Sequence, residues 1–262
     1  MTGLRRQRGS IVVVIPVKLP VVQPGQKLSS LILRALDRNR LNLLNGDVVC
    51  VASKVISAAE GRITLLESKK VSKLARRYAD KYKMNSKLAQ TVVDEADKIL
   101  GGVHGFLLTT KSGILTANAG IDVKNSPPET ATLWPIDPDR SARLLRRSLQ
   151  NRFRRRIGVM IVDSRIAPLR LGTTGLAIGS SGFQVLKDDR GKPDLYGRTV
   201  KVTQLNVADD IAASAHLLMA ERDERIGLVI IRNAPVLMTN NGRASRLKII
   251  PKKCLFWSSL AK

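Results

Sequence analysis

Asp47-Val48-Val49-Cys50-Val51-Ala52 is the stretch that decides the fold class, because five apolar residues follow one another without polar interruption. A short apolar run of this kind, rich in β-branched residues, predicts a strand buried on both faces of a sheet. Residues 10–15 have the same character, and residues 157–162 and 228–231 are also expected to be strands. Helical patterns lie between these strands. We therefore expect an α+β (mixed α/β) fold with mixed sheets.

The helical patterns are distinguished by their start signals and their apolar stripes. A helix of about four turns is expected from Ser29 to near Asn45-Gly46. Residues 68–100 predict a helical pair. Asn85 or Ser86 caps the second of these helices, whose apolar face carries Leu88, Val92, Ala96 and Ile99. Asp137-Pro138-Asp139 predicts a further helix start, before a stripe of Ala142, Leu145, Leu149 and Phe153. Another helix is expected around Ile211, Ala215 and Leu218.

The remaining segments predict short strands and turns. Residues 106–110 and 113–117 are expected to form a hairpin around Lys111-Ser112, and Glu60-Gly61 to end the loop after residues 47–52. A short strand is expected at residues 176–178 within a glycine-rich stretch, and another at residues 199–206. The organisation expected is a basic arm at residues 1–10, one catalytic unit at residues 11–235 and a basic C-terminal segment at residues 236–262.

The composition is dominated by positive charge, with 45 Lys and Arg against 21 Asp and Glu and a formal net charge of +24. Such a balance attracts polyanions, among them nucleic acids, acidic lipid surfaces and nucleotides, without choosing between them. No apolar run is long enough for a membrane span and no signal peptide is evident, so we expect a cytoplasmic protein. Cys50 is expected to be a buried free thiol, although a disulfide with Cys254 is also compatible with the sequence.

Several classes of chemistry find no support in the sequence. It has neither a Walker-type phosphate loop nor a dinucleotide-binding glycine turn. The two histidines, His104 and His216, have no metal-ligand spacing and no partner serine motif, which argues against zinc and serine-nucleophile chemistry.

Oxygen ligands for a hard cation remain. Asp122, Asp163 and Glu221 each fall at the boundary of an expected element, and Ser164 adds a hydroxyl group beside Asp163. Mg²⁺ and Mn²⁺ take such ligands and share their coordination with phosphates. Taken singly, each carboxylate is explained as simply by a cap or a solvated charge. The same holds for Asn118-Ala119-Gly120, which is either an ordinary turn or a close backbone approach with Asn118 and Asn125 placed around Asp122.

Five blocks in order resemble signatures of the coenzyme F420-0:L-glutamate ligase family, in its archaeal single-unit form. They extend from about residue 11 to residue 232 and comprise Ser53-Lys54-Val55-Ile56-Ser57-Ala58-Ala59-Glu60-Gly61-Arg62, residues 118–125, Ala177-Ile178-Gly179, Asp194-Leu195-Tyr196-Gly197-Arg198 and Val207-Ala208-Asp209-Asp210-Ile211-Ala212. The resemblance implies an intertwined two-lobed fold, a homodimer, and a GTP-dependent enzyme that adds L-glutamate to coenzyme F420-0 through an acyl phosphate.

The same resemblance implies roles for single residues. Asp122 and Asp163 would hold one metal ion, and Ser164 and Glu221 a second, either Mg²⁺ or Mn²⁺, with K⁺ as a further cofactor; Arg170 would act with the two aspartates in catalysis. The residues that match the family's nucleotide-binding positions are Leu19, Pro20, Val21, Val22, Ser53, Lys54, Ser57, Asn125, Met219, Ala220, Arg222, Asp223 and Ile226.

Two positions depart from the family pattern. Ala58 stands where the family often has Lys, and Ile166-Ala167 replaces a Gly-Arg pair in the loop after Asp163, where Arg165 is a candidate to reach the same anion. The altered loop leaves open the same ligase chemistry on another carboxylate acceptor. A third interpretation is nucleic-acid binding, since residues 140–156 hold eight arginines and no acidic residue; the scarcity of aromatic side chains argues against it.

Overall fold

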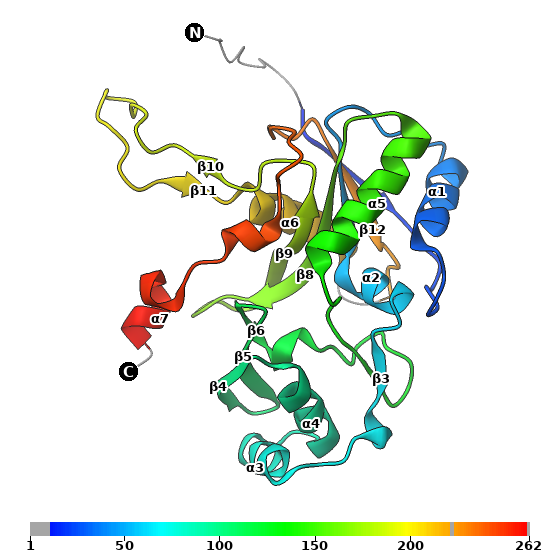
Figure 1. Ribbon diagram of the computed structural model, residues 1–262, viewed down its shortest axis with the longest axis vertical. Coiled ribbons are helices and arrows are strands. Elements are labelled where there is room, and N and C mark those ends of the chain that lie inside the picture. Colours follow the sequence, from blue (N-terminus) through cyan, green and yellow to red (C-terminus); the bar gives the residue numbers. More distant parts are fainter. Residues whose placement is uncertain (1–10, 221–222, 261–262) are drawn as a thin grey trace.

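A five-stranded mixed sheet forms the centre of the protein in the computed structural model, which describes residues 11–220 and 223–260 (Figure 1). Its strands are ordered β1 (Val13–Val17), β12 (Leu228–Arg232), β2 (Val48–Ala52), β8 (Gly158–Ile166) and β9 (Thr173–Ser181). Strands β2 and β8 are parallel, and every other neighbouring pair is antiparallel. The expected α+β class with mixed sheets is confirmed.

Helices cover both faces of this sheet. Helices α1 (Leu28–Arg38) and α5 (Pro138–Phe153) pack on one face, and α6 (Val207–Met219) packs on the other. Within β2, Val49 and Val51 join the cluster under α1 and α5, whereas Val48 and Cys50 join the cluster under α6. This alternation explains why the strand is apolar at successive positions. Cys50 is a free, fully buried thiol, as expected, and burial raises its pKa.

A second group of elements lies below the central sheet in Figure 1. It contains the sheet β4 (Lys98–Val103), β5 (Phe106–Lys111) and β6 (Ile114–Ala117), with α3 (Lys73–Tyr82) and α4 (Ser86–Glu95). Its small core includes Val92, Leu107 and Leu133. The pair β3 (Ile63–Leu65) and β7 (Thr130–Thr132) lies between the two parts of the molecule. The other elements are α2 (Ser53–Ala59), η1 (Leu66–Ser68), η2 (Asn118–Gly120), β10 (Lys187–Asp188), β11 (Gln204–Leu205), η3 (Ala244–Leu247), η4 (Pro251–Lys253) and α7 (Leu255–Leu260).

Several local predictions are confirmed by hydrogen bonds. The Asn85 side chain accepts from the backbone N–H groups of Lys87 and Leu88 at the start of α4. The Asp137 carboxylate accepts from Arg140 N–H at the start of α5, with Pro138 in the first turn. The β5–β6 hairpin turns at residues 111–114, and α6 and β12 occupy the segments expected for them.

Other predictions were wrong in extent or in kind. Strand β1 begins later than residue 10 and is an edge strand, so Val13 is 39% exposed rather than buried on both sides. Helix α1 spans only Leu28–Arg38, about three turns, because Arg40 adopts a positive φ of 53°. The helical pair ends at Glu95, and Ile99 lies in β4.

Four further segments differ from the prediction. Residues 53–59, expected as a loop, form α2. Strand β8 continues through Asp163 to Ile166, and β9 runs over nine residues, since the two strands pair along that length. Of residues 199–206, only Gln204–Leu205 form a strand, paired with β10 in a two-stranded arm.

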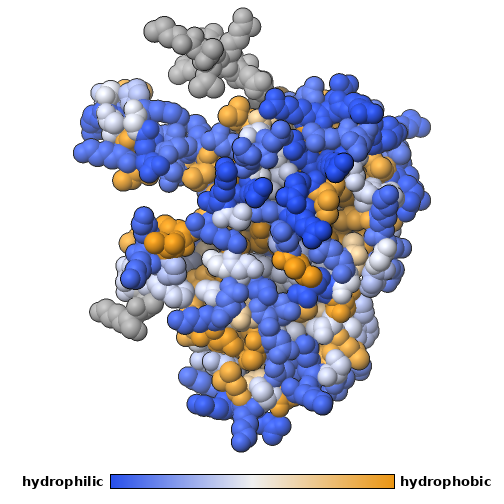
Figure 2. Space-filling model, viewed as in Figure 1, coloured by the Kyte–Doolittle hydropathy of each residue, from blue (hydrophilic) through white to orange (hydrophobic). Residues whose placement is uncertain are grey.

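The surface is largely hydrophilic on the face that Figure 2 shows, in keeping with the excess of charged residues. Among the helices described here, none has the length and apolar character that crossing a membrane would require. The predicted basic arm at residues 1–10 lies outside the described residues, as do Glu221 and Arg222.

One buried ion pair, between Asp47 and Arg232, joins two neighbouring strands of the central sheet. Asp47 is fully buried and accepts hydrogen bonds from Arg232 at both carboxylate oxygens, at 3.0 and 2.8 Å. It also accepts from Leu44 N–H at 2.8 Å. The pair joins the start of β2 to the end of β12, and the Asp47 carboxylate raises the pKa of Arg232.

We expect Asp47→Ala to lower the free energy of unfolding by about 3–5 kcal/mol, because it leaves the Arg232 guanidinium without its partner. Urea denaturation followed by circular dichroism measures the change. Asp37→Ala is the control, since Asp37 is exposed and lies 3.9 Å from Arg152; it should leave stability unchanged. Equal stability of the two variants would contradict a structural role for the pair.

Candidate active site

The candidate site begins where two parallel strands end side by side. In the register of β2 and β8, Ala52 pairs with Val162, so the next residues, Ser53 and Asp163, are neighbours. Ser53 Oγ donates to Asp163 Oδ1 at 3.0 Å. The carboxyl ends of parallel strands are the usual position for functional side chains in such sheets. The sheet topology alone therefore brings these two predicted residues together.

The Asp163 carboxylate is held by donors on several sides. Trp134 Nε1 donates to its second oxygen, and the backbone N–H of Ser164 and the Lys54 ammonium group also stabilise its ionised form. Burial has the largest effect and raises the pKa of Asp163 above its ordinary value of 3.8, with these donors acting in opposition. An additional cation at this carboxylate would favour its ionised form.

The second predicted carboxylate, Asp122, reaches the same place through Lys54. Lys54 Nζ lies 2.7 Å from Asp122 Oδ2. Backbone hydrogen bonds in both directions with Thr132, at 3.0 and 2.8 Å, fix the position of Asp122, and Lys124 N–H donates to its Oδ1 at 2.7 Å. The adjacent residues Ser53 and Lys54, at the start of α2, thus contact one aspartate each.

Trp134 is the site residue that the sequence analysis missed. This residue is only 4% exposed, and Arg62 Nε donates to its backbone oxygen at 3.0 Å. Gly120 has a φ of 73°, and a Cβ atom there would lie 2.2 Å from the indole nitrogen of Trp134. Only glycine fits against this ring. One signal was available, because Trp134 is one of only two tryptophans in a chain that is 3% aromatic.

The predicted nucleotide-binding segments meet beside α2. Leu19 N–H donates to the Arg225 oxygen at 3.0 Å, and Ala52 N–H donates to the Gly227 oxygen at 3.1 Å. A Cβ atom on Gly227 would lie 2.8 Å from the Val55 side chain and 3.1 Å from that of Leu19. The loop after β1, the start of α2 and the segment before β12 therefore form one continuous surface.

The individual predicted residues differ in accessibility on that surface. Pro20, Val21, Ala220 and Asp223 are exposed, as is Asn125 in the loop after Asp122, whereas Lys54 and Ile226 are half-buried; Leu19, Val22, Ser53, Ser57 and Met219 are buried. Ser57 is 1% exposed, so its side chain faces the interior. Arg222 lies outside the described residues.

The structure places three residues of the prediction, Asn118, Arg165 and Arg170, away from Asp122 and Asp163 or in other contacts. Asn118 does not surround Asp122: its side chain is buried and accepts from Leu107 N–H at 2.8 Å, which makes it a structural residue. Arg165 lies 3.5 Å from Asp209 on α6. Arg170 is exposed at the tip of the β8–β9 hairpin, where Leu169 and Leu171 are fully exposed.

The described donors suit a hard cation. Asp122 and Asp163 share the Lys54 ammonium as a neighbour, which shows that the pair already accommodates positive charge. The half-buried Ser164 adds a hydroxyl group next to Asp163. Among residues 11–220 and 223–260, no cluster of three His, Cys, Asp or Glu side chains is close enough to bind a metal ion. The third predicted carboxylate, Glu221, lies outside those ranges.

The chain is similar to known proteins over most of its length. Residues 16–233 match the model of the family described as F420-0:Gamma-glutamyl ligase. Similar proteins named coenzyme F420:L-glutamate ligase come from Methanothermobacter thermautotrophicus (38% identical, 83% of this chain and 86% of that protein) and Archaeoglobus fulgidus (40% identical, 85% and 88%). A third, from Methanocaldococcus jannaschii, is 36% identical over 92% of this chain and 94% of that protein.

We expect Asp163→Asn to stabilise the metal-free protein at neutral pH. A carboxyl group whose pKa is raised on folding favours the native state only while protonated; that contribution is complete below 3.8 and is lost as the pH rises through the raised value. Asparagine stays neutral and can still accept from Trp134 and bond to Ser53. Urea denaturation in a chelating buffer at pH 4 and pH 7 tests this, with the larger gain at pH 7.

The matched variant is Asp163→Ala, which leaves both donors without an acceptor and should destabilise the protein at both pH values. Asp163→Asn would contradict the expectation if it lowered the free energy of unfolding at pH 7 as much as Asp163→Ala does, because the ionised carboxylate would then not destabilise the folded protein.

Proposed function

The chain belongs to the F420-0:gamma-glutamyl ligase family, and we propose that it forms an amide between L-glutamate and coenzyme F420-0 at the expense of GTP. The observation that carries this proposal is the joint position of Asp122 and Asp163 around Ser53-Lys54. Two carboxylates, a hydroxyl group and a lysine beside an open loop surface are the groups that phosphoryl transfer requires for positioning and charge neutralisation.

The reaction proceeds in two steps. An oxygen of the acceptor carboxylate attacks the γ-phosphorus of GTP, the bond to the β-phosphate oxygen breaks, and GDP leaves. The glutamate amine then attacks the acyl carbon, phosphate departs with the electron pair of its C–O bond, and the amine loses a proton. Lys54 would offset negative charge during the first step, since its ammonium group contacts Asp122 at 2.7 Å and also favours the ionised form of Asp163.

Divalent metal is part of the proposal. Asp122 and Asp163 would hold one Mg²⁺ or Mn²⁺ ion, with Ser164 and Glu221 at a second. Bound metal would neutralise the phosphate charge and orient the triphosphate. The exposed residues Pro20, Val21, Asn125, Ala220 and Asp223 offer the nucleotide backbone and side-chain contacts at the surface beside α2.

A homodimer is supported by apolar side chains on two projecting hairpins. The β8–β9 tip exposes Leu169 and Leu171 completely. The β10–β11 arm, which projects to one side in Figure 1, exposes Leu195, Tyr196 and Val202 by 79–90%. Side chains of this size are seldom left uncovered together, and a second copy of the chain would bury them. The role of Arg170, between Leu169 and Leu171, depends on what covers this tip.

A second candidate keeps the chemistry and changes the acceptor. The loop that departs from the family pattern is the exposed β8–β9 tip, where Ile166 is 59% exposed and an apolar side chain replaces a glycine. A loop so changed would suit an acceptor other than coenzyme F420-0.

Incubation of the purified protein with GTP, Mn²⁺ or Mg²⁺, L-glutamate and coenzyme F420-0 separates the two candidates. The main proposal requires a mass increase of the coenzyme by one or more glutamyl residues, with stoichiometric GDP release. GDP release that depends on some other carboxylate would favour the second candidate. No mass increase with intact, folded protein would refute the first.

We expect Asp122→Asn to lower kcat by at least about a hundredfold, the effect typical of removing a group that stabilises transition-state charge, while the protein stays folded. Asp37→Asn is the matched control, because Asp37 is an exposed aspartate on α1. The readouts are GDP release and Mn²⁺ binding followed by electron paramagnetic resonance. Full activity with unchanged Mn²⁺ affinity in Asp122→Asn would remove it from the site.

A further inference from the structure

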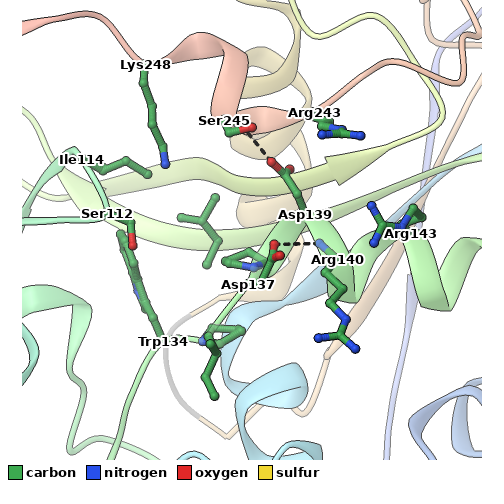
Figure 3. A pocket seen from close by; sticks show the side chains of 14 residues that line it. Ser112, Ile114, Trp134, Asp137, Asp139, Arg140, Arg143, Arg243, Ser245 and Lys248 are labelled. Carbon is green, nitrogen blue, oxygen red and sulfur yellow. Dashed lines mark hydrogen bonds between the residues drawn. The ribbon is translucent and has the colours of Figure 1, made fainter.

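A cavity of about 250 Å³ lies directly behind the active-site tryptophan. Its walls are the first turns of α5, the β5–β6 hairpin and the segment around η3 (Figure 3). Trp134 lines this cavity and also donates to Asp163, so the two sites are separated by one indole ring. A ligand in the cavity would therefore lie beside the reacting groups.

The cavity carries more positive than negative charge. Arg140, Arg143, Arg243 and Lys248 line it, and within the described chain no ion pair joins any of them to a carboxylate. Figure 3 shows the Lys248 side chain extending from the C-terminal segment toward the middle of the cavity, with Arg143 and Arg243 on the other side. Cations that surround a cavity and have no carboxylate partner form a site for anionic groups.

The two carboxylates in the cavity differ in how many hydrogen bonds they accept. Asp139 is engaged at both oxygens, because it accepts from the N–H groups of Ser180, Ala244 and Ser245 at 2.8, 2.9 and 3.2 Å. Asp137 accepts one backbone N–H, that of Arg140, through Oδ1 at 2.9 Å. Its other oxygen therefore remains available to a ligand donor, such as an ammonium group.

We propose that this cavity binds the free amino-acid substrate of the ligase, an acidic amino acid with two carboxylates and one amine. The inference rests on the proposed function and adds to it the location of the second substrate. The arginines and Lys248 receive the carboxylates, and the free oxygen of Asp137 receives the amine. A small dicarboxylic amino acid suits the volume, while the exposed surface beside α2 stays available for the nucleotide.

The mixed charge distinguishes this ligand from a purely anionic one. A phosphate or a phosphodiester would use the four cations but would be repelled by Asp137 at the same wall. An amino acid satisfies both signs of charge at once. The apolar part of the lining, from Ile114, Trp134 and Ile178, suits the methylene groups of such a side chain.

The C-terminal segment contributes two of the four cations that line this site. Arg243 and Lys248 lie beyond residues 16–233, which match the family model. Asp139 holds this segment against α5 through its bonds to Ala244 and Ser245, and a Cβ atom on Gly113 would lie 3.6 Å from the Lys248 side chain. Specificity for the amino acid would thus depend in part on residues outside the range that matches the family model.

The binding test uses Trp134 as its reporter. In a Trp257→Phe background, Trp134 is the one remaining tryptophan of the chain. We expect L-glutamate to change its fluorescence in a saturable manner. The double variant Arg243→Ala/Lys248→Ala should weaken this binding at least tenfold, the scale of losing one charged hydrogen bond. Arg246→Ala is the matched control, since Arg246 belongs to the same η3 segment, is exposed and does not line the cavity.

Steady-state kinetics gives a second, separate readout. The double variant should raise KM for glutamate at least tenfold and leave KM for GTP unchanged, while Arg246→Ala should alter neither. Unchanged glutamate binding in the double variant would overturn the proposal, as would a rise in KM for coenzyme F420-0 in place of glutamate. Inorganic phosphate that competes with glutamate for the Trp134 signal with equal affinity would identify a general anion site instead.

Failure of the two proposals can be told apart. Saturable glutamate binding that is lost in the double variant, in a protein without ligase turnover, would uphold the cavity and refute the proposed reaction. Turnover by the double variant with a wild-type KM for glutamate would support the proposed reaction and refute the cavity as the glutamate site.

Discussion

The parallel pairing of β2 with β8 is the constraint on which the rest of the site depends. It places Ser53 and Asp163 at adjacent strand ends, and the hydrogen bond between them follows from that register. Helix α2 starts at the same point and directs Lys54 toward Asp122, which comes from a different part of the chain. A slip of one residue between the two strands would turn Asp163 to the opposite face of the sheet. The geometry of the candidate site is thus a consequence of sheet register.

Trp134 connects this sheet to the smaller part of the molecule. Arg62 bonds both to the Trp134 backbone oxygen, at 3.0 Å, and to Glu95, at 2.8 Å. Burial raises the pKa of Glu95, but Lys111 and Arg62 outweigh that effect and hold it below its ordinary value. Gly120 lets the indole approach closely. The Asn118-Ala119-Gly120 turn therefore supports Asp163 through the indole ring, whereas local chemistry left open an ordinary turn or a close backbone approach around Asp122.

Sequence reasoning succeeded where the signal is local and failed where the partner is distant. Asn85 and Asp137 cap their helices within three residues, and β2 is apolar on both sides because each face has its own helices. The extension of β8 through Asp163 depends on pairing with β9, and the role of Trp134 depends on contacts with Gly120 and Asp163. Periodicity and capping signals do not reveal such pairs. The family resemblance singled out Asp122 and Asp163, and the fold brings both to Ser53-Lys54, while their roles as metal ligands stay predictions.

The net charge of +24 acquires a more specific meaning from the fold. Part of it is structural, since Arg146 Nε donates to the Ile157 oxygen and an Arg156 guanidinium N–H to the Met238 oxygen, both at 2.8 Å. These two arginines thus tie segments of the chain to one another. The cations without carboxylate partners at the start of α5 and in the η3 segment instead surround a concave site. A positive field that converges on a hollow raises the local concentration of small anions. Every substrate of the proposed reaction is an anion, so the same field would serve all three and leave their discrimination to the polar groups at each site.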